Sequence, residues 1–169
     1  MARRKNIREK FHKLAEKERV TGNDTRLADW EPVMAIGTAA GMVNLSVSAL
    51  RKYEREGLLI YHRTESGRRL LCRADIKRIK MIQHMINDLG LNIEGIRRLL
   101  ALLPCWDLKL CSSEDKATCE AMKDETKPCW MTNNICVTEH RLNCRDCEVY
   151  RYGAYCAVTM KLLLHGKNG

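Results

Sequence analysis

The sequence lacks the long hydrophobic runs and the apolar leader that mark membrane and secreted proteins. No hydrophobic stretch in its 169 residues approaches the roughly 18 residues of a membrane span. The opening segment, MARRKNIREKFHKLAEKER, is charged throughout, unlike the apolar centre of a signal peptide. These absences predict a cytoplasmic protein with no membrane partner.

Motifs that identify common enzyme classes are also missing. The sequence has no glycine-rich nucleotide-binding loop, no paired carboxylates in an apolar setting and no nucleophile placed beside a base. We therefore expect no enzyme and no catalytic residues. An iron-sulfur oxidoreductase that uses the cysteines remains the alternative from a different functional class.

Cysteine and charge divide the chain into two unlike parts. Residues 1–104 contain one of the nine cysteines, Cys72, and 21 Lys and Arg against 12 Asp and Glu. The rest of the chain contains eight cysteines and equal numbers of acidic and basic residues, so the net charge of +9 belongs to the first part. A basic domain joined to a neutral, cysteine-rich module predicts that the first part contacts a polyanion and that the second has another role.

The cysteine-rich part contains one sequence pattern twice. The first copy, PCWDLKLCSSEDKATC at 104–119, has Cys-Trp, four residues, Cys, seven residues and Cys, and the second copy, PCWMTNNICVTEHRLNC at 128–144, differs by one inserted residue. Because the chain has only three tryptophans, this agreement indicates an internal repeat. The repeat is too short for a solenoid and predicts a pseudo-symmetric pair of half-sites.

We divide the chain into residues 1–30, residues 31–103 and residues 104–169. Residues 3–20 contain helix formers with a narrow apolar stripe, which favours a basic helix, and TGNDT at 21–25 ends it. This helix is a solvated arm, a DNA-contacting arm or a dimerisation helix.

Residues 31–103 have the pattern of a compact helical unit. Thr38 is expected to cap a first short helix that Asn44 closes. Ser46 is expected to cap a second helix that Gly57 ends in the left-handed conformation. Two short helices joined by a tight turn fit a helix-turn-helix.

The remainder of this segment predicts a hairpin and two further helices. LLIYHRTESGRRLLC at 58–72 has two β-prone pieces around a turn, with basic residues at its tip and flanks. A helix is expected from about Arg73 to Leu89, with an apolar stripe that begins at Ile76. Asn92 is expected to cap a last short helix before Pro104.

The residues of this segment also carry a resemblance to a known family. LSVSALRKYEREGLLIYHRTESGRRL at 45–70, with DLGLNIEGIRRLL at 88–100, resembles the MerR family of bacterial winged-helix transcription regulators, and the match covers roughly residues 33–103. The resemblance implies a mainly α fold, a winged helix-turn-helix with a small β-hairpin wing, followed here by a small irregular cysteine-rich module. It also implies a homodimer on double-stranded promoter DNA, RNA polymerase as a further partner, and action by distorting the promoter spacer.

The pattern of the second helix agrees with DNA binding. Small polar residues at its start can approach base edges in the major groove, whereas later cations and the hairpin arginines can approach phosphates. The predicted DNA-binding residues are Ser46, Val47, Ser48, Arg51, Lys52, Tyr53, Arg63, Arg68 and Arg69. Tyr53 could equally belong to the core. The alternative for the whole segment is a helical domain whose basic residues are only solvated.

Three departures from the MerR pattern limit which properties of the family can be expected of this chain. Lys52 and Leu70 stand where the family commonly has aromatic residues, so base preference is not transferred. No heptad repeat follows Pro104, although the family usually dimerises through a coiled coil there. Dimerisation is therefore expected to use the N-terminal helix, the cysteine module or the tail CAVTMKLLLHG at 156–166.

The clustered cysteines predict a metal site or redox chemistry. Thiolates are soft ligands, and four of them complete one zinc site or hold one iron-sulfur cluster. In a reducing compartment, a dense cysteine framework favours these uses over permanent disulfides. The predicted ligands are Cys105, Cys111, Cys119, Cys129, Cys136, Cys144 and Cys147. Cys156 is expected to be a spare or structural thiol.

Several interpretations of this module stay open. The cysteines could hold an iron-sulfur cluster or structural zinc, act as a thiol or metal sensor, or be inert buried thiols. His140 could add a nitrogen ligand or simply be exposed, and Trp106 and Trp130 could shield a cluster or anchor the core. The segment also resembles a double Cys-Trp module attached to bacterial signalling proteins, which supports a sensor role.

These observations lead to one functional prediction. We predict a sequence-specific DNA-binding transcription regulator whose C-terminal cysteine cluster senses redox state, an oxidant or a metal. The alternative within the same class is a constitutive regulator in which zinc only replaces the missing coiled coil.

Overall fold

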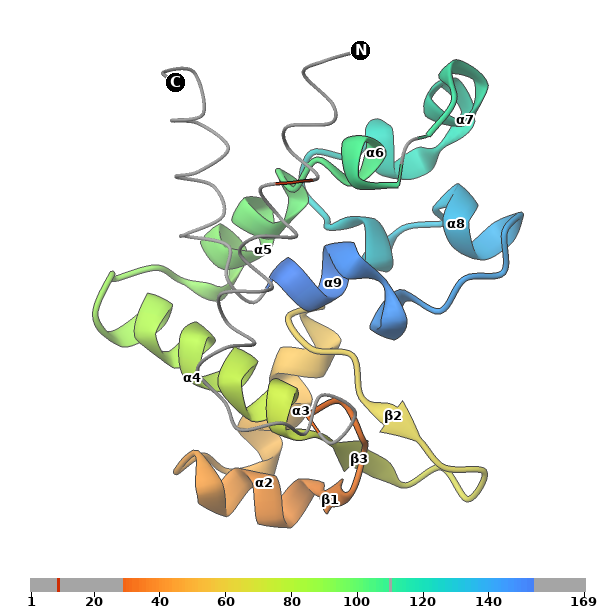
Figure 1. Cartoon of the computed structure of the whole chain (residues 1–169). Helices are drawn as coiled ribbons and strands as arrows, with labels where there is room; N and C mark the ends of the chain where they lie inside the picture. The colour runs from red at the N-terminus through yellow and green to blue at the C-terminus, as the bar shows by residue number, and fades with distance from the viewer. Residues whose placement is uncertain (1–8, 10–28, 110, 154–169) are drawn as a thin grey trace. The chain divides into compact units, whose positions relative to one another are not determined.

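The computed structural model describes residue 9, residues 29–109 and residues 111–153, which form mostly helices (Figure 1). Two compact units are present, one of residues Asp24–Arg97 and one of residues Met1–Asn23 with Arg98–Gly169. The mainly α prediction is confirmed. The expected N-terminal helix, the tail and Cys156 lie outside the described residues. None of the described helices combines the length and hydropathy needed to cross a membrane.

The unit Asp24–Arg97 begins with a helix-turn-helix. Helices α2 (Ile36–Met42) and α3 (Val47–Arg55) are joined by a short turn in which Asn44 has a φ of 52°. The Ser46 hydroxyl accepts the N–H of Ala49 at 3.1 Å and caps α3, as predicted. At the other end of α3, Gly57 has a φ of 72°, a conformation that glycine adopts at little cost.

The predicted cap of α2 is wrong. The helix begins at Ile36, so Thr38 lies inside its first turn, and Ala35 occupies the cap position without a side-chain hydrogen bond. Ala35 also belongs to a strand, which already gives it the extended backbone that a cap position needs.

Replacing Ser46 with alanine is expected to destabilise the protein by about 0.5–2 kcal/mol, because the N–H of Ala49 loses its acceptor. Ser48→Ala is the matched control, since the Ser48 hydroxyl contacts Ser46 at 2.8 Å but is not the cap. Urea unfolding of both variants measures the difference in the free energy of unfolding. Equal losses in the two variants would show that the cap contributes nothing.

Three short strands form an antiparallel sheet in the order β1-β3-β2. Strands β2 (His62–Arg63) and β3 (Arg69–Leu71) form the predicted hairpin, in which Gly67 donates its N–H to the carbonyl of Thr64 at 2.8 Å. Figure 1 shows the hairpin tip projecting away from the helices. Strand β1 (Met34–Ala35) pairs with β3 and was not predicted, because two residues are too short for an alternating pattern.

Helix α4 (Arg73–Asn87) contributes one apolar face to the core behind the helix-turn-helix. Its predicted stripe is buried at Ile76, Ile79, Ile82 and Met85, and half-buried at Ile86. The Gln83 side chain donates to the carbonyl of Val43 at 2.9 Å, which joins α4 to the turn after α2.

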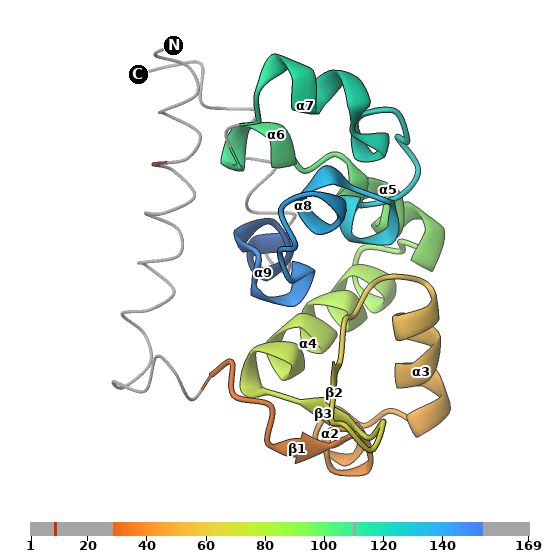
Figure 2. The same ribbon diagram turned by 90° about the vertical axis from the view of Figure 1, so that its right-hand side faces the viewer.

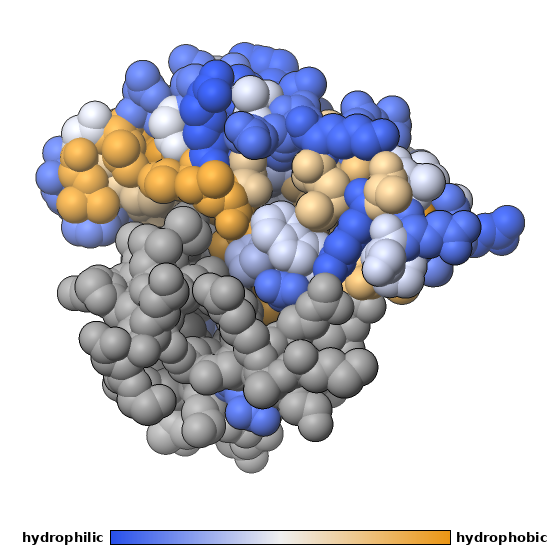
Figure 3. Space-filling view, turned by 90° about the horizontal axis from the view of Figure 1, so that it is seen from above, coloured by the Kyte–Doolittle hydropathy of each residue, from blue (hydrophilic) through white to orange (hydrophobic). Residues whose placement is uncertain are grey.

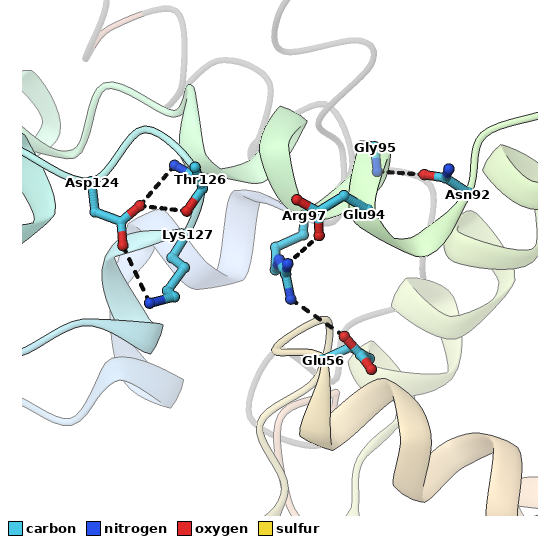
Figure 4. Close-up of polar contacts among 8 residues, drawn as sticks. All are labelled: Glu56, Asn92, Glu94, Gly95, Arg97, Asp124, Thr126 and Lys127. Atoms are coloured by element: carbon cyan, nitrogen blue, oxygen red, sulfur yellow. Dashed lines mark hydrogen bonds and ion pairs between the residues drawn. The ribbon is translucent and has the colours of Figure 1, made fainter.

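Helix α5 (Ile93–Ala101) is attached to the end of α3 by a charged side chain (Figure 4). Asn92 accepts the N–H of Gly95 at 2.7 Å, which confirms it as the cap of α5. The guanidinium of Arg97 pairs with Glu94 on its own helix and with Glu56, the residue after α3, at 3.3 Å. The start of α5 is therefore fixed to the C-terminal end of α3.

The second unit is an irregular group of short helices without a strand in its described part (Figure 2). These elements are α6 (Cys105–Leu108), α7 (Ser113–Thr118), η1 (Glu120–Met122), η2 (Cys129–Met131), α8 (Ile135–Thr138), η3 (Cys144–Asp146) and α9 (Glu148–Gly153). Leu108, Ile135, Val149 and Tyr150 form a small core. The rings of Trp130 and Tyr150 meet edge to face, with their centroids 5.3 Å apart.

One carboxylate forms several hydrogen bonds within the linker between the two repeat copies. Asp124 accepts the N–H of Thr126 at 2.8 Å and its hydroxyl at 2.6 Å, and also pairs with Lys127 at 3.4 Å (Figure 4). These hydrogen bonds hold the pKa of Asp124 at about 2, below its usual value. The linker is thus a defined turn.

Candidate nucleic-acid interface and cysteine pocket

Helix α3 presents one polar face and one buried face. Ser46, Ser48, Arg51 and Lys52 are exposed, Val47 is half-buried, and the opposite face is buried through Leu50. An amphipathic helix of this kind keeps its polar face free for a partner. The exposed hydroxyls precede the exposed cations along the helix, which is the arrangement that the sequence predicted for a major-groove contact.

Tyr53 lies on the buried face of α3. Its side chain is 7% exposed, and burial raises the pKa of its hydroxyl. The structure therefore favours the core alternative for this residue over a phosphate contact. A second tyrosine, Tyr61, donates its hydroxyl to the carbonyl of Leu50 at 2.7 Å. This hydrogen bond connects the start of strand β2 to α3.

The hairpin is held against α3 by a carboxylate that the sequence did not single out. One oxygen of Glu54 accepts a hydrogen bond from Arg63 at 2.7 Å, and the other accepts one from Arg69 at 2.8 Å. Two of the three predicted hairpin cations are thus already paired within the protein. The third, Arg68, is exposed near the hairpin tip. Glu54 is one of three acidic residues in the basic segment 45–70, so no signal in the sequence pointed to it alone.

Replacing Glu54 with glutamine is expected to strengthen non-specific DNA binding and to steepen its salt dependence. The two arginines lose a carboxylate and become available to about one or two phosphates, so the slope of log K against log salt should steepen by about 1–2. Fluorescence anisotropy on random-sequence duplex DNA across a salt series measures the slope.

Glu65→Gln is the matched control for this variant, because it removes the same charge from the exposed hairpin turn and leaves the Glu54 pairs in place. An equal change in slope in both variants would show that the effect of Glu54→Gln comes from the change in net charge alone. An unchanged slope for Glu54→Gln alone would mean that the two arginines do not reach DNA.

All seven predicted ligand cysteines line one pocket in the second unit. We call this cavity the cysteine pocket. The cysteines that line it are Cys105, Cys111, Cys119, Cys129, Cys136, Cys144 and Cys147. Both copies of the repeat contribute three of them, and no disulfide joins any of the seven. Cys119 is buried and the other six are half-buried. The spacing pattern in the sequence therefore identified the residues that meet in space.

The first cysteines of the two copies affect the pKa values of each other. Cys105 and Cys129 share a hydrogen bond between their side chains, and this bond lowers the pKa of Cys105 while it raises that of Cys129. Each lies at the first position of a short helix, Cys105 in α6 and Cys129 in η2.

Three further thiols of the cysteine pocket have raised pKa values, which favours their neutral form. Burial raises the pKa of Cys111, that of Cys144, and that of Cys136 to about 11. The Asn134 amide approaches the sulfur of Cys144 at 3.9 Å and acts in the opposite direction. A bound cation would reverse this order, since a coordinating thiol is deprotonated by the metal.

The donor set of the cysteine pocket suits a soft metal. Seven cysteines line one cavity, which exceeds the four that a zinc site or an iron-sulfur cluster needs. Within the described residues, no three His, Cys, Asp or Glu side chains are yet arranged as a coordination site. Binding would therefore require some of the thiols to rotate into the cavity. His140 is exposed.

The two repeat tryptophans have similar positions beside the sulfur atoms. Trp106 and Trp130 both line the cysteine pocket and are half-buried. Trp130 also packs on the buried ring of Tyr150. The contact of Trp130 with the core supports its role as an anchor, and the position of both rings at the cavity also allows them to limit water access.

Comparison with known proteins finds similarity to transcription regulators. Residues 34–103, which span β1 to α5, match the family described as MerR HTH family regulatory protein. The HTH-type transcriptional regulator ZntR of Escherichia coli K12 is 27% identical over 135 residues, which cover 79% of this chain and 94% of that protein. The putative heat shock protein HspR of Streptomyces coelicolor is 34% identical over 80 residues, 47% of this chain and 53% of that protein.

Proposed function

Because residues 34–103 belong to the MerR family of helix-turn-helix regulatory proteins, we propose that this DNA-binding transcription regulator senses redox state, an oxidant or a metal through its cysteine pocket. The observation that carries the sensing function is that six cysteines from the two repeat copies, together with Cys147, line one cavity. Inert buried thiols have no reason to converge in this way, whereas a soft ligand or an oxidant needs neighbouring sulfur atoms.

The DNA-binding role is supported by the location of the charge. The net charge of +9 belongs to the part of the chain that contains the MerR-family domain, and α3 presents hydroxyls and cations on its exposed face. Members of this family bind promoter DNA, usually as dimers. The proposed action is therefore in the cytoplasm on double-stranded promoter DNA, with RNA polymerase as the partner that reads the distorted promoter, and without a catalytic step.

A homodimer would need a contact surface other than a coiled coil. Figure 3 shows that some hydrophobic residues of the described part of the chain lie at the surface. In the second unit, Leu102 is 53% exposed, and Val137 and Leu142 are also exposed. Exposed apolar side chains of this size are typical of interaction surfaces when they are contiguous.

The cysteine pocket would hold zinc or an iron-sulfur cluster with four of its seven thiolates. Zinc would fix the geometry of the short helices, and a cluster would add reversible electron transfer. The chain itself brings the sulfur atoms into one cavity and places two tryptophans at its wall. Because these helices are short, a ligand that binds several of the sulfur atoms can shift their arrangement.

The first experiment is to purify the full chain without oxygen and to measure iron, sulfide and zinc together with the visible absorption spectrum. A broad band near ~400 nm with matched iron and sulfide indicates a cluster, and the DNA affinity of its oxidised and reduced forms then tests the sensing role. Colourless protein with stoichiometric zinc indicates a zinc site. Protein that binds neither, and whose DNA binding ignores metals and oxidants, contradicts the proposed function.

Metal removal distinguishes the proposed sensor from the alternative, a constitutive regulator with structural zinc. In that case a chelator should unfold the second unit and lower DNA binding at any redox potential. In the sensor, a redox or metal change should alter DNA binding while far-UV circular dichroism shows that the helices persist.

A further inference from the structure

One buried amide of the second unit contacts the segments of three pocket cysteines at once. Asn134 is 4% exposed and lines the cysteine pocket. Its Nδ2 donates to the carbonyl of Cys129 at 2.6 Å and approaches the Sγ of Cys144 at 3.9 Å. Its Oδ1 accepts the N–H of Val137 at 3.2 Å and so caps α8, the helix that contains Cys136. A single side chain therefore connects three of the seven cysteines.

The hydrogen-bond partners of this amide determine which of its ends faces the sulfur. The carbonyl oxygens of Cys129 and Thr132 can only accept hydrogen bonds, whereas the N–H of Val137 can only donate one. The nitrogen end must therefore point toward the carbonyls and toward Cys144, and the oxygen end toward the start of α8. A metal-bound thiolate is negatively charged, so it is stabilised by an N–H donor and destabilised by a carboxylate.

The first copy of the repeat carries a donor at the equivalent position. Asn134 stands two residues before Cys136, the second cysteine of its copy, and Lys109 stands two residues before Cys111 in the other copy. Lys109 is half-buried, and its side chain also lines the cysteine pocket. Both side chains offer N–H donors, although their residue types differ. Each repeat copy thus contributes one donor to the wall of the pocket.

Building on the proposed metal binding in the cysteine pocket, we propose that Asn134 is a positioning residue of this site. It holds the backbone around Cys129 and Cys136 in place and donates its amide N–H to the thiolate of Cys144. Because the backbone is held, the thiols can turn toward a metal by rotation about their own side-chain bonds. Residues that support metal ligands in this way usually contribute about 10- to 100-fold to metal affinity.

The test replaces Asn134 with aspartate, which has the same shape. Aspartate is also a good helix cap, so Asn134→Asp keeps the acceptor for the N–H of Val137 but loses the N–H donors that face Cys129 and Cys144. The probe is Zn²⁺ added to reduced, metal-free full-length protein, and competition with a chromophoric chelator measures its affinity. We expect Asn134→Asp to bind Zn²⁺ about 10- to 100-fold more weakly than the wild-type protein.

Asn143→Asp is the matched control. Asn143 is exposed, caps η3 by accepting the N–H of Arg145 at 3.0 Å, and directly precedes Cys144, but it is not among the residues that line the pocket. The control adds the same charge beside the same cysteine and leaves the Asn134 amide unchanged, so its Zn²⁺ affinity should stay close to that of the wild-type protein. An equal loss in both variants, or no loss in Asn134→Asp, overturns the proposal.

A measurement on the wild-type protein covers the case in which Asn134→Asp does not fold. In a nitrogen-proton correlation NMR spectrum, the side-chain amide signals of Asn134 should shift when Zn²⁺ is added, whereas those of the exposed Asn143 should not. Unchanged Asn134 signals in protein that binds Zn²⁺ overturn the proposal and leave metal binding in place. Wild-type protein that binds no Zn²⁺ contradicts the metal-binding part of the proposed function, and the positioning role of Asn134 with it.

Discussion

Replacing Tyr150 with alanine is expected to destabilise the second unit by about 3–5 kcal/mol, the usual range for loss of a buried aromatic ring. Tyr150 is 1% exposed and is among the largest fully buried side chains of the described residues. Its ring supports Trp130, which in turn lines the cysteine pocket. The loss of the ring therefore leaves a cavity in a core that has few other large side chains.

This variant also tests what holds the second unit together. Thermal unfolding of metal-free protein, followed by tryptophan fluorescence, gives the free energy, and Tyr150→Phe is the control that keeps the ring and its contact with Trp130. If a metal in the pocket supplies most of the stability, the alanine variant should unfold easily without metal and recover with zinc. A loss below about 1 kcal/mol in metal-free protein would mean that this core contributes little.

The helix-turn-helix could be predicted well because its signals are local. The Ser46 cap, the left-handed Gly57 and the stripe of α4 depend on residues within one or two turns, and all three were confirmed. The predicted Thr38 cap failed because pairing of β1 with β3, a contact distant in sequence, sets where α2 begins. Local patterns do not report such pairing.

The site was predictable as a set of residues but not as a set of contacts. The sequence identified the seven cysteines that line one pocket, six of them by the repeat spacing, but it does not say how they are arranged. Their arrangement comes from the packing of short helices that lie apart in the sequence. The same holds for Glu54, whose two arginine partners lie on different strands of the hairpin.

Replacing Arg51 with alanine is expected to weaken operator binding by about 1–3 kcal/mol, roughly 5- to 150-fold, if its guanidinium reads a base edge. Arg51 is exposed on the polar face of α3, one turn after Ser48, and forms none of the ion pairs seen in the described residues. An arginine in this position is free to place its planar fork on guanine in the major groove.

The measurement needs an operator, which repeated selection from a random duplex library with the wild-type protein supplies. Arg51→Lys is the matched variant, because lysine keeps the charge and loses the fork. If Arg51 reads a base, both variants should lose affinity for the operator while binding to unrelated DNA changes little. If Arg51 contacts a phosphate, Arg51→Lys should bind almost normally, and Arg51→Ala should weaken binding to every sequence and reduce the salt slope by about 1. The second result would mean that Ser46 and Ser48, rather than Arg51, contact the base edges. Their hydroxyls precede Arg51 along the chain.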